Sequence, residues 1–568
     1  MSLAAVWTPI LAGEQYAREG ALGPWLRRDV PPSFGYTDGE SVERGLLEFL
    51  KNTADRSVLS PALLAEVGDW PRRYHLSPRR ANLLRPLEAF LRGRRVLEVG
   101  AGCGAITRYL GEIGCDVLAV EGSAARARVV AARCAGLDGV TVVAETLQTL
   151  EPHPMFDVVT LIGVLEYARI FFPAPEGVDP VDAMLSCATR FLAPGGVVLV
   201  GIENQLGLKY FAGYGEDHVN QPMFGVEDRY QPTGVVTFGR KDLAARLRGA
   251  GLGCQQWLFP FPDYKLPVAV LSERGVRGVD GIDLGPLATA SVAADLQTPP
   301  RMSFSLEAAW RPVLRNGLGG ELANSFLAIA AAAERKVVDE DVLAWHFAVE
   351  RAPHYAKRTV FRVRRDAVWV EPERLAADVP IAPGQLAMRL APTPFQRGEL
   401  WHHALLSLLN QPGWTAGQVA QWAVRWLSCL ETLHPAVAGR AEGLRTRLPG
   451  WMLDAVPRNM IVDGDHASFI DLEWDLVAGL SLGHLCYRAI VQSLTGVASV
   501  AQPAAATDLS PLHVFEQCMT VLGFGEIGPY LIEWHAAERG FQVLATGVDI
   551  PRDFAALSAS RLMVRGQS

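Results

Sequence analysis

Short apolar runs alternate with longer amphipathic stretches between residues 94 and 272. This pattern predicts strands connected by helices, and such a chain folds as a parallel sheet with helices on both faces. We predict strands at 95–99, 116–120, 140–143, 156–162, 196–202 and 266–271, with Pro194-Gly195-Gly196 as the turn before the fifth. The expected fold class of this part of the chain is therefore α/β.

The chain outside this block has other patterns. Residues before 74 predict an irregular and then helical lead-in, and residues 273–300 show no clear periodicity. Helical patterns at 398–433 and after Gly483 are preceded by strand-like pieces at 322–329, 358–363 and 367–370. Strands followed by helices predict a second, α+β domain. The expected division is a lead-in at 1–73, an α/β domain at 74–275, a linker at 276–300 and an α+β domain at 301–568.

Composition narrows the class of protein. The net charge is −8 and no long basic run occurs, so we do not expect electrostatic capture of nucleic acid. None of the eight cysteines forms a C-x-x-C pair, which fits a reducing compartment without a zinc site. The N-terminus lacks a basic region, and no apolar run approaches a membrane span. We expect a cytoplasmic protein, and peripheral contact with a membrane complex stays open.

A glycine-rich turn follows the first predicted strand, where Glu98 leads into Gly100, Gly102 and Gly104. These glycines remove each Cβ that would block a ligand from the backbone. The N–H groups of such a turn, at the start of a helix, suit an anionic or polar ligand. Glu121 ends the second strand about twenty positions later, where a carboxylate can bind a ribose diol.

The glycine spacing separates two cofactor classes. A dinucleotide site needs G-x-G-x-x-G, whereas this chain has E-x-G-x-G-x-G. The latter resembles motif I of the class I S-adenosylmethionine (SAM) methyltransferases. Further segments follow in the order of that family, namely Ala144-Glu145-Thr146, 156–162 with Gly163-Val164-Leu165-Glu166-Tyr167, and Leu192-Ala193-Pro194-Gly195-Gly196. The resemblance covers about residues 75–272 and implies a Rossmann-like fold that binds SAM. A tight turn without a ligand is the alternative.

The resemblance also implies roles for single residues. Glu121 would accept hydrogen bonds from the ribose hydroxyls, and Glu145 would lie near the adenine amino group. The full set of implied cofactor residues is Glu98, Gly100, Gly102, Gly104, Glu121, Glu145, Thr146 and Gly163. Structural alternatives exist, because Glu98 could cap the amides of the turn and Glu121 could be a solvated strand end.

Methyl transfer is an in-line displacement, so the protein mainly aligns the acceptor with the sulfonium. An alcohol acceptor must also lose a proton to a general base, and His218, Glu203 and Glu166 are the candidates. His218 lies in the long segment 204–236, whose length is typical of a substrate lid, although a surface role is as consistent. Glu203-Asn204 also resembles the metal ligands of catechol-type O-methyltransferases, with Glu166 as a further oxygen ligand.

Three segments rich in aromatic and polar residues resemble methyltransferases from bacterial surface-polysaccharide clusters. They are 202–211, Asp228-Arg229-Tyr230 and 259–267. Rings that stack on a pyranose, with nearby carboxylates and amides, suit a sugar acceptor. Aromatic residues at this density are equally consistent with a core.

The C-terminal part contains a second motif. Asp454 is followed five residues later by Asn459 and then by Phe469-Ile470-Asp471. This order resembles the aminoglycoside-phosphotransferase branch of the protein-kinase-like fold. It implies that Asp454 orients a hydroxyl, that Asn459 and Asp471 hold Mg²⁺, and that Lys357 binds ATP. Met452 stands where that family has histidine, and we find no convincing phosphate loop, so an active kinase and an inactive homologue both remain open.

Together the two parts resemble the bifunctional methyltransferase-kinases that cap polymannan O-antigen chains. We therefore expect a SAM-dependent O-methyltransferase acting on a bacterial cell-surface glycan or its precursor. A kinase-like domain would phosphorylate or bind the same substrate, and peripheral association with a polysaccharide-assembly complex stays open. The alternatives are a non-catalytic scaffold of such a complex and a small-molecule methyltransferase of secondary metabolism.

Overall fold

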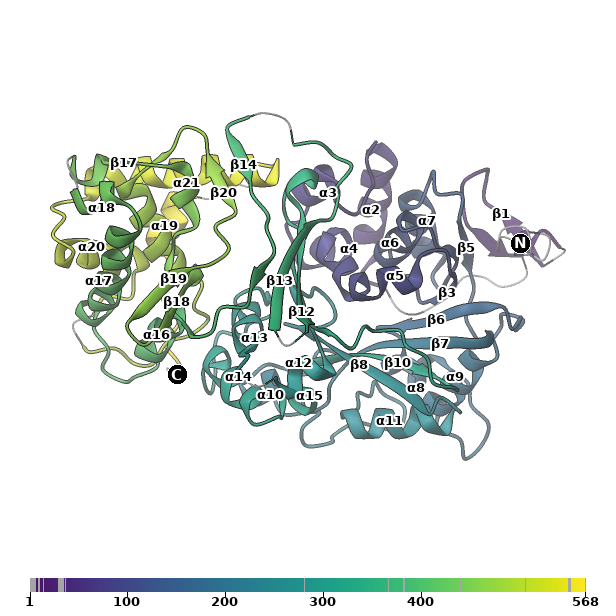
Figure 1. Cartoon of the computed structure of the whole chain (residues 1–568). Coiled ribbons are helices and arrows are strands. Elements are labelled where there is room, and N and C mark those ends of the chain that lie inside the picture. Colours follow the sequence, from purple (N-terminus) through teal and green to yellow (C-terminus); the bar gives the residue numbers. More distant parts are fainter. Residues whose placement is uncertain are drawn as a thin grey trace. The chain divides into compact units, whose positions relative to one another are not determined.

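The computed structural model describes residues 7–8, 11–13, 15–28, 35, 37–279, 281–365, 367–381, 384–439, 442–505, 507–549 and 553–566. Parts of the predicted lead-in, including 1–6 and 29–34, lie outside these ranges. The chain forms two compact units (Figure 1). Unit 1 is Met1–Tyr210, Gly215–Val276 and Leu318–Glu350, and unit 2 is Phe211–Tyr214, Arg277–Gly317 and Arg351–Ser568. No helix of the described residues is long and apolar enough to cross a membrane.

Unit 1 is built on a sheet with the strand order β1-β2-β5-β4-β3-β6-β7-β10-β8-β9-β11. The strands are β1 Tyr16–Arg18, β2 Trp25–Arg27, β3 Arg95–Val99, β4 Asp116–Glu121, β5 Val140–Ala144, β6 Phe156–Ile162, β7 Leu192–Glu203, β8 Cys254–Phe261, β9 Ala269–Ser272, β10 Ser325–Ala331 and β11 Val342–Ala348. The central strands β5, β4, β3, β6 and β7 are parallel. The first five predicted strands and the α/β class are thus confirmed.

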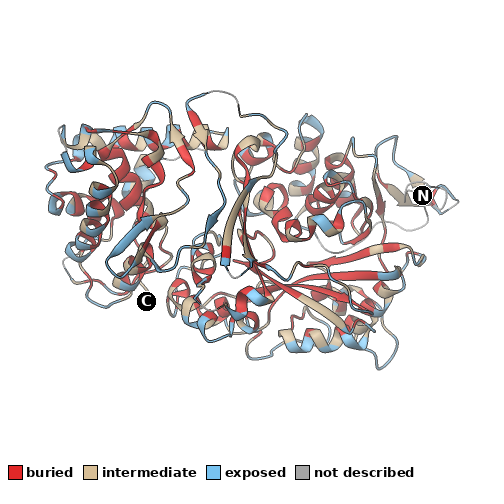
Figure 2. Cartoon of the chain, in the orientation of Figure 1, coloured by how far each residue is buried: buried red, intermediate tan, exposed pale blue. Residues whose placement is uncertain are grey.

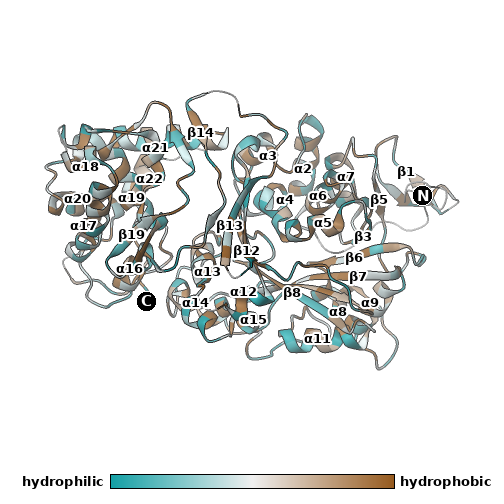
Figure 3. Cartoon of the chain, viewed as in Figure 1, coloured by the Kyte–Doolittle hydropathy of each residue, from teal (hydrophilic) through white to brown (hydrophobic). Residues whose placement is uncertain are grey.

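Helices connect these strands. They are α2 Glu40–Asn52, α3 Pro61–Ala65, α4 Trp70–Leu76, α5 Glu88–Leu91, α6 Ala105–Glu112, α7 Ala124–Arg133, α8 Ala168–Phe171, α9 Pro180–Thr189, α10 Leu208–Phe211, α11 Arg240–Gly249, α12 Glu273–Arg277 and α15 Gly319–Leu322. The strands β3 and β6 and the second part of β7, from Gly196 to Glu203, are mostly buried (Figure 2) and apolar (Figure 3), as expected for a sheet covered on both faces.

Three expectations about strands were wrong. Pro194-Gly195-Gly196 is part of β7, whose pairing with β6 shifts in register between Phe156 and Val158. The strand-like piece at 322–329 belongs to unit 1 and not to the second domain, because β10 lies between β7 and β8, antiparallel to both. β8 was missed because its glutamines break the apolar pattern.

The predicted linker at 276–300 contains helix α13, Gly285–Val292, which packs against α14, Leu306–Arg315, in unit 2. Thr289 Oγ1 donates to the carbonyl of Glu307 at 3.0 Å. The helix was missed because its buried face consists mainly of Gly, Ala, Thr and Ser, which leave no apolar periodicity in the sequence.

Unit 2 combines short antiparallel strands with a helical core. The strands are β12 Lys357–Arg364, β13 Ala367–Arg374, β14 Leu386–Met388, β15 Thr393–Pro394, β16 Glu399–Leu400, β17 Arg447–Leu448, β18 Met460–Asp463, β19 His466–Phe469, β20 Trp474–Leu476 and β21 Leu480–Ser481. The helices are α16 Trp401–Leu409, α17 Ala416–Leu433, α18 Pro435–Gly439, α19 Leu482–Thr495, α20 Pro511–Val521, α21 Leu531–Thr546 and α22 Phe554–Ala559. Among the described residues, five buried tryptophans pack in this core: Trp414, Trp422, Trp426, Trp474 and Trp534.

Candidate active site

A cavity of about 150 Å³ opens in unit 1 at the carboxyl ends of β3, β4 and β6. Ligands of open parallel sheets bind at this edge. The predicted cofactor residues that line the cavity are Glu98, Gly100, Gly102, Glu121, Glu145, Thr146 and Gly163. The structure therefore gathers at one edge of the sheet residues that lie on four different strand ends.

The three glycines of the turn have different reasons to be glycine, although all have positive φ angles of 69°, 57° and 80°. A Cβ on Gly100 would lie 2.5 Å from Val164 Cγ2, and one on Gly104 would lie 3.1 Å from Val130 Cα. A Cβ on Gly102 would meet no atom within 4 Å. Gly102 thus faces the cavity, whereas Gly100 and Gly104 allow close packing of the turn.

The carboxylate of Glu121 is fixed by the backbone. Its Oε2 accepts the N–H of Gly102 at 2.7 Å, and its Oε1 accepts that of Ser123 at 2.9 Å. Each oxygen keeps lone-pair capacity for another donor. Burial raises the pKa of Glu121, and it raises the pKa of neighbouring Glu98 to about 8.

Glu145 is held by the N-terminal hairpin. Its Oε2 accepts from Tyr16 Oη at 2.8 Å and from Arg27 at 3.1 Å, and its Oε1 accepts the Thr146 N–H at 3.0 Å. The carboxylate is thus largely used within the protein, and its contact with an adenine stays a prediction. Tyr16 and Arg27 were missed, because nothing local in the sequence links them to a residue more than a hundred positions away.

The part of the chain before β3 also contributes to the cavity wall, which the sequence did not indicate. Asp38 and His75 line the cavity together with Arg126 of α7. His75 Nε2 lies 2.8 Å from Asp38 Oδ2, and Arg126 binds both Asp38 and Glu43. Burial lowers the pKa of His75, so it is neutral near pH 7.

The three predicted general bases meet beside this cavity. The ligand-type atoms of Glu166, Glu203 and His218 all lie within 4.8 Å of one another. These residues do not line the cavity themselves. Gly163 and Tyr167 do, and they border the cluster, since the rings of Tyr167 and His218 are 5.3 Å apart. Glu166 and Glu203 are buried and only 8% of the His218 side chain is exposed, which argues against the surface alternative for His218.

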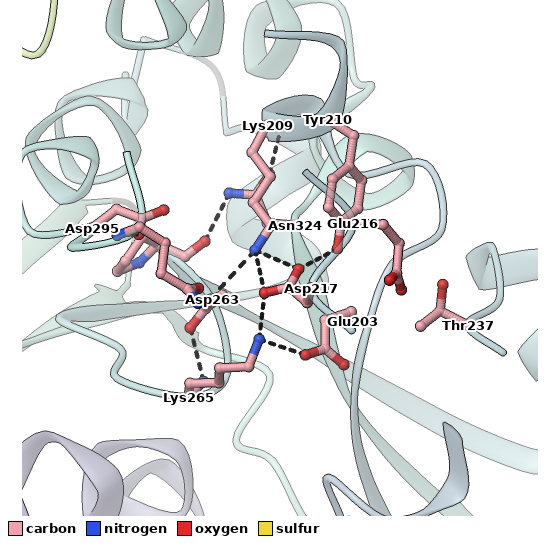
Figure 4. Close-up of polar contacts among 12 residues, drawn as sticks. Glu203, Lys209, Tyr210, Glu216, Asp217, Thr237, Asp263, Lys265, Asp295 and Asn324 are labelled. Atoms are coloured by element: carbon pink, nitrogen blue, oxygen red, sulfur yellow. Dashed lines mark hydrogen bonds and ion pairs between the residues drawn. The ribbon is translucent and has the colours of Figure 1, made fainter. Parts of the chain in front are cut away.

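Figure 4 shows that lysines complete this polar region. Lys265 Nζ lies 2.6 Å from Glu203 Oε1 and 2.5 Å from Asp217 Oδ1, and Lys209 Nζ lies 2.8 Å from Asp217 Oδ2. Burial favours the neutral imidazole of His218, but the carboxylates of Glu203, Glu166 and Glu216 outweigh it and raise its pKa well above the ordinary value. The imidazole of His218 is then protonated, and it must lose this proton before it can act as a general base.

Asn204 does not fit the metal-ligand role. Its Nδ2 donates to the carbonyls of Glu321 and Ala323 at 2.8 and 2.7 Å, and its Oδ1 accepts the N–H of Leu206. The side chain therefore fixes the backbone between β7 and β10.

Unit 2 brings together two residues to which the kinase resemblance gave separate roles, Lys357 for ATP and Asp471 for Mg²⁺. Lys357 Nζ on β12 lies 2.8 Å from Asp471 Oδ1 and 2.7 Å from Glu473 Oε2. Arg351 also binds Glu473 at 2.7 Å. The sequence did not indicate Glu473 or Arg351 as part of this group.

Asp454 is turned inward. Its Oδ2 accepts the N–H groups of Glu473 and Trp474 at 3.2 and 3.1 Å, and Arg488 lies 3.4 Å from its Oδ1. Burial raises the pKa of Asp454 to about 6. Asn459 Nδ2 donates to the carbonyl of Asp454 at 3.1 Å. These contacts support the local fold, and the roles of Asp454 and Asn459 in phosphoryl transfer stay predictions.

Comparisons with known proteins point to one family. A family model described as a methyltransferase domain matches residues 97–198. The chain is 29% identical to the ubiquinone biosynthesis O-methyltransferase of Alkalilimnicola ehrlichii over 160 residues, which is 27% of this chain and 60% of that protein. It is 30% identical to the protein of the same name from Bordetella avium over 188 residues, covering 31% and 69% of the two chains. A solved structure, the 1,6-didemethyltoxoflavin-N1-methyltransferase of Burkholderia thailandensis, is 24% identical, with a TM-score of 0.22 and coverage of 30% of this chain and 67% of that one. The chain thus spans about 60% of the first of these curated relatives.

Proposed function

Because this chain belongs to the class I SAM-dependent methyltransferases, we propose that unit 1 binds SAM at the carboxyl edge of its sheet and transfers a methyl group to an acceptor oxygen. The observation that carries the proposal is the pair of Gly102 and Glu121. Gly102 leaves the cavity open where any side chain would enter it, and Glu121 is held by two backbone amides with lone pairs to spare. A carboxylate so fixed is suited to two ribose hydroxyls.

The other cavity residues fit the charge of this cofactor. When bound, SAM supplies an electrophilic methyl carbon on a sulfonium and carries an ammonium group. Glu98 Oε2 is buried and accepts no hydrogen bond from any described residue. A carboxyl group with one unsatisfied oxygen at the cavity edge is suited to a cationic donor, whose binding stabilises the ionised form.

The chain's own contribution to methyl transfer is positioning and proton removal. Glu166 and Glu203 lie next to the cavity wall formed by Gly163 and Tyr167, so an acceptor hydroxyl near this wall has carboxylates within reach. The names of the relatives support an acceptor that is a small molecule. A cell-surface glycan or its precursor is the alternative, and it rests on the resemblance to surface-polysaccharide enzymes, as does the assembly complex. We also propose a cytoplasmic location, which rests on the scattered cysteines of the sequence.

Calorimetry with S-adenosylhomocysteine tests the cofactor site. We expect micromolar affinity for the unaltered protein and at least a ten-fold loss for E121Q, at a temperature below the melting transition of each. D138N removes an exposed carboxylate outside the cavity and is expected to bind normally. Undiminished binding by E121Q, or binding of a nicotinamide dinucleotide instead, would refute the assignment. Labelled SAM offered with phenolic small molecules and with mannose oligosaccharides then separates the two acceptor classes.

We also propose that unit 2 binds a nucleotide with Mg²⁺ in a kinase-like site. The contact between Lys357 and Asp471, 114 positions apart in sequence, supports this arrangement. Millimolar ATP with Mg²⁺ is expected to raise the melting temperature of the unaltered protein and of D465N, an exposed control, but not that of D471N. An unmoved melting curve of the unaltered protein would favour the inactive homologue.

A further inference from the structure

The polar cluster beside the cavity is divided into two halves of different charge balance. In one half, two lysines face two aspartates: Lys209 and Lys265 bind Asp217, and Lys209 lies 3.6 Å from Asp263. Burial raises the pKa of Asp217, but both lysines outweigh it and keep the pKa well below its usual range. This half is electrically balanced.

The other half is not balanced. It contains three buried glutamates, Glu166, Glu203 and Glu216, and one histidine, His218. Lys265 reaches Glu203 with one contact, but it is shared with Asp217. With all three carboxylates ionised, this half holds excess negative charge inside the protein even when the imidazole is protonated. Buried charges of one sign are costly unless a cation or a hydrogen-bond donor compensates them.

Glu166 is the clearest sign of a missing partner. Its side chain is buried, and neither oxygen accepts a hydrogen bond from any described residue. The nearest cationic atom is His218 Nε2, at 3.9 Å from Oε1. Glu203 Oε2 likewise accepts no hydrogen bond within the described chain. Buried polar atoms are normally satisfied, so these oxygens indicate a ligand between them.

His218 is oriented toward the same space. Glu216 Oε1 lies 2.9 Å from its Nδ1, while Glu216 Oε2 accepts the N–H groups of His218 and Val219 at 2.8 and 2.9 Å. With Nδ1–H donating to this fixed carboxylate, Nε2 faces Glu166 and can bind a cation once it releases its proton. A carboxylate that holds the far nitrogen of an imidazole is the usual support of a metal-binding histidine.

We propose that Glu166, Glu203 and His218 bind one divalent cation of the manganese-to-zinc series. Their ligand atoms lie within 4.8 Å of one another. Ligands at about 2.1 Å from one ion at tetrahedral angles are about 3.4 Å apart, so side-chain shifts of about an ångström complete the site. One imidazole with two carboxylates suits these ions better than Mg²⁺ or Ca²⁺, which prefer oxygen alone.

Three protein ligands leave coordination positions for an oxygen of the acceptor. A metal-bound hydroxyl loses its proton more easily, so the ion would assist the removal of the acceptor proton. This role rests on the proposed methyl transfer. The binding of the ion itself does not depend on it, since it follows from the charge and geometry of the cluster.

The site is tested by titrating the chelator-treated full chain with Mn²⁺. Calorimetry measures the binding, and electron paramagnetic resonance measures the ion that stays free. We expect one ion per chain in the unaltered protein and a loss of affinity of at least a hundred-fold in E166Q and in H218Q. E227Q removes an exposed glutamate from the segment 204–236, which also contains His218, and this variant should bind Mn²⁺ as the unaltered chain does. D471N should also retain the ion, because it alters only the predicted Mg²⁺ residue of unit 2.

The outcomes separate this site from the proposed function. No stoichiometric Mn²⁺ in the unaltered protein would refute the site, and equal binding by E166Q would show that Glu166 is not a ligand of the ion. E166Q preserves the size of the side chain and removes a buried charge, so its melting temperature should not fall. If the protein binds S-adenosylhomocysteine but not Mn²⁺, only the metal site is overturned. If it binds Mn²⁺ but not S-adenosylhomocysteine, only the methyltransferase assignment is overturned.

Discussion

Replacement of Gly102 by alanine measures how directly the glycine turn faces its ligand. Gly102 has a φ of 57°, and a Cβ there meets no protein atom within 4 Å. The added methyl therefore strains the backbone by about 1–2 kcal/mol without a clash in the free protein. It also enters the cavity, so we expect the affinity for S-adenosylhomocysteine to fall at least ten-fold, which corresponds to about 1.4 kcal/mol.

Gly114 provides a matched control. Its φ is 84°, its Cβ would also meet no atom within 4 Å, and it is exposed outside the cavity. G114A should lose a similar free energy of unfolding, measured by urea titration, but keep its affinity in calorimetry. Equal affinities of G102A and G114A would refute the placement of the cofactor against this turn. A larger loss of stability in G102A would show that its Cβ meets the protein.

Further predictions concern packing and charge. G100A should lower the free energy of unfolding by about 1–3 kcal/mol more than G114A, because its Cβ would lie 2.5 Å from Val164; equal urea midpoints would contradict this. Since burial raises the pKa of Glu98 to about 8 from 4.5, the unfolded chain ionises first and stability falls as pH rises through this window. E98Q has no carboxyl to ionise and therefore does not lose this stability. In urea titrations, its free energy of unfolding relative to the unaltered protein should rise from pH 5 to pH 8, by at most about 5 kcal/mol. A difference that stays constant over this pH range would refute the shift in pKa. G483A should lower the melting temperature of unit 2, because its Cβ would lie 2.2 Å from Trp534 Cζ2, while G417A on α17 should raise it slightly as a helix-favouring control.

The sequence predicted the parts of the fold that local pattern determines. The parallel strands and the turn with Glu121 were visible because apolar runs and glycine spacing act over a few residues. β10 was assigned to the wrong domain, since all its residues are buried and nothing in Ser325–Ala331 identifies the neighbouring strands. Its position depends on pairing with segments more than sixty residues away.

The same limit applies to the site. Glu166, Glu203 and His218 were identified singly from the segments that follow strands, but their meeting is a property of the folded chain. The link from Tyr16 to Glu145 spans 129 positions, and the inward turn of Asp454 depends on Arg488 from another helix. Spacing motifs describe a residue type and its local backbone. They do not describe which distant side chains will occupy its hydrogen bonds.

The place of β10 bears on how the protein emerges from the ribosome. The chain leaves unit 1 after Val276 and returns at Leu318, so β7 and β8 stay unjoined until the strand between them has been synthesised. At about 5–20 residues per second, the 64 positions from the end of β8 to the start of β10 take roughly 3–13 s. During that interval two apolar strand edges lack their partner and are open to mispairing. A gene cut after residue 276 would make this transient exposure permanent, because a piece that ends before β10 lacks the strand that joins β7 to β8.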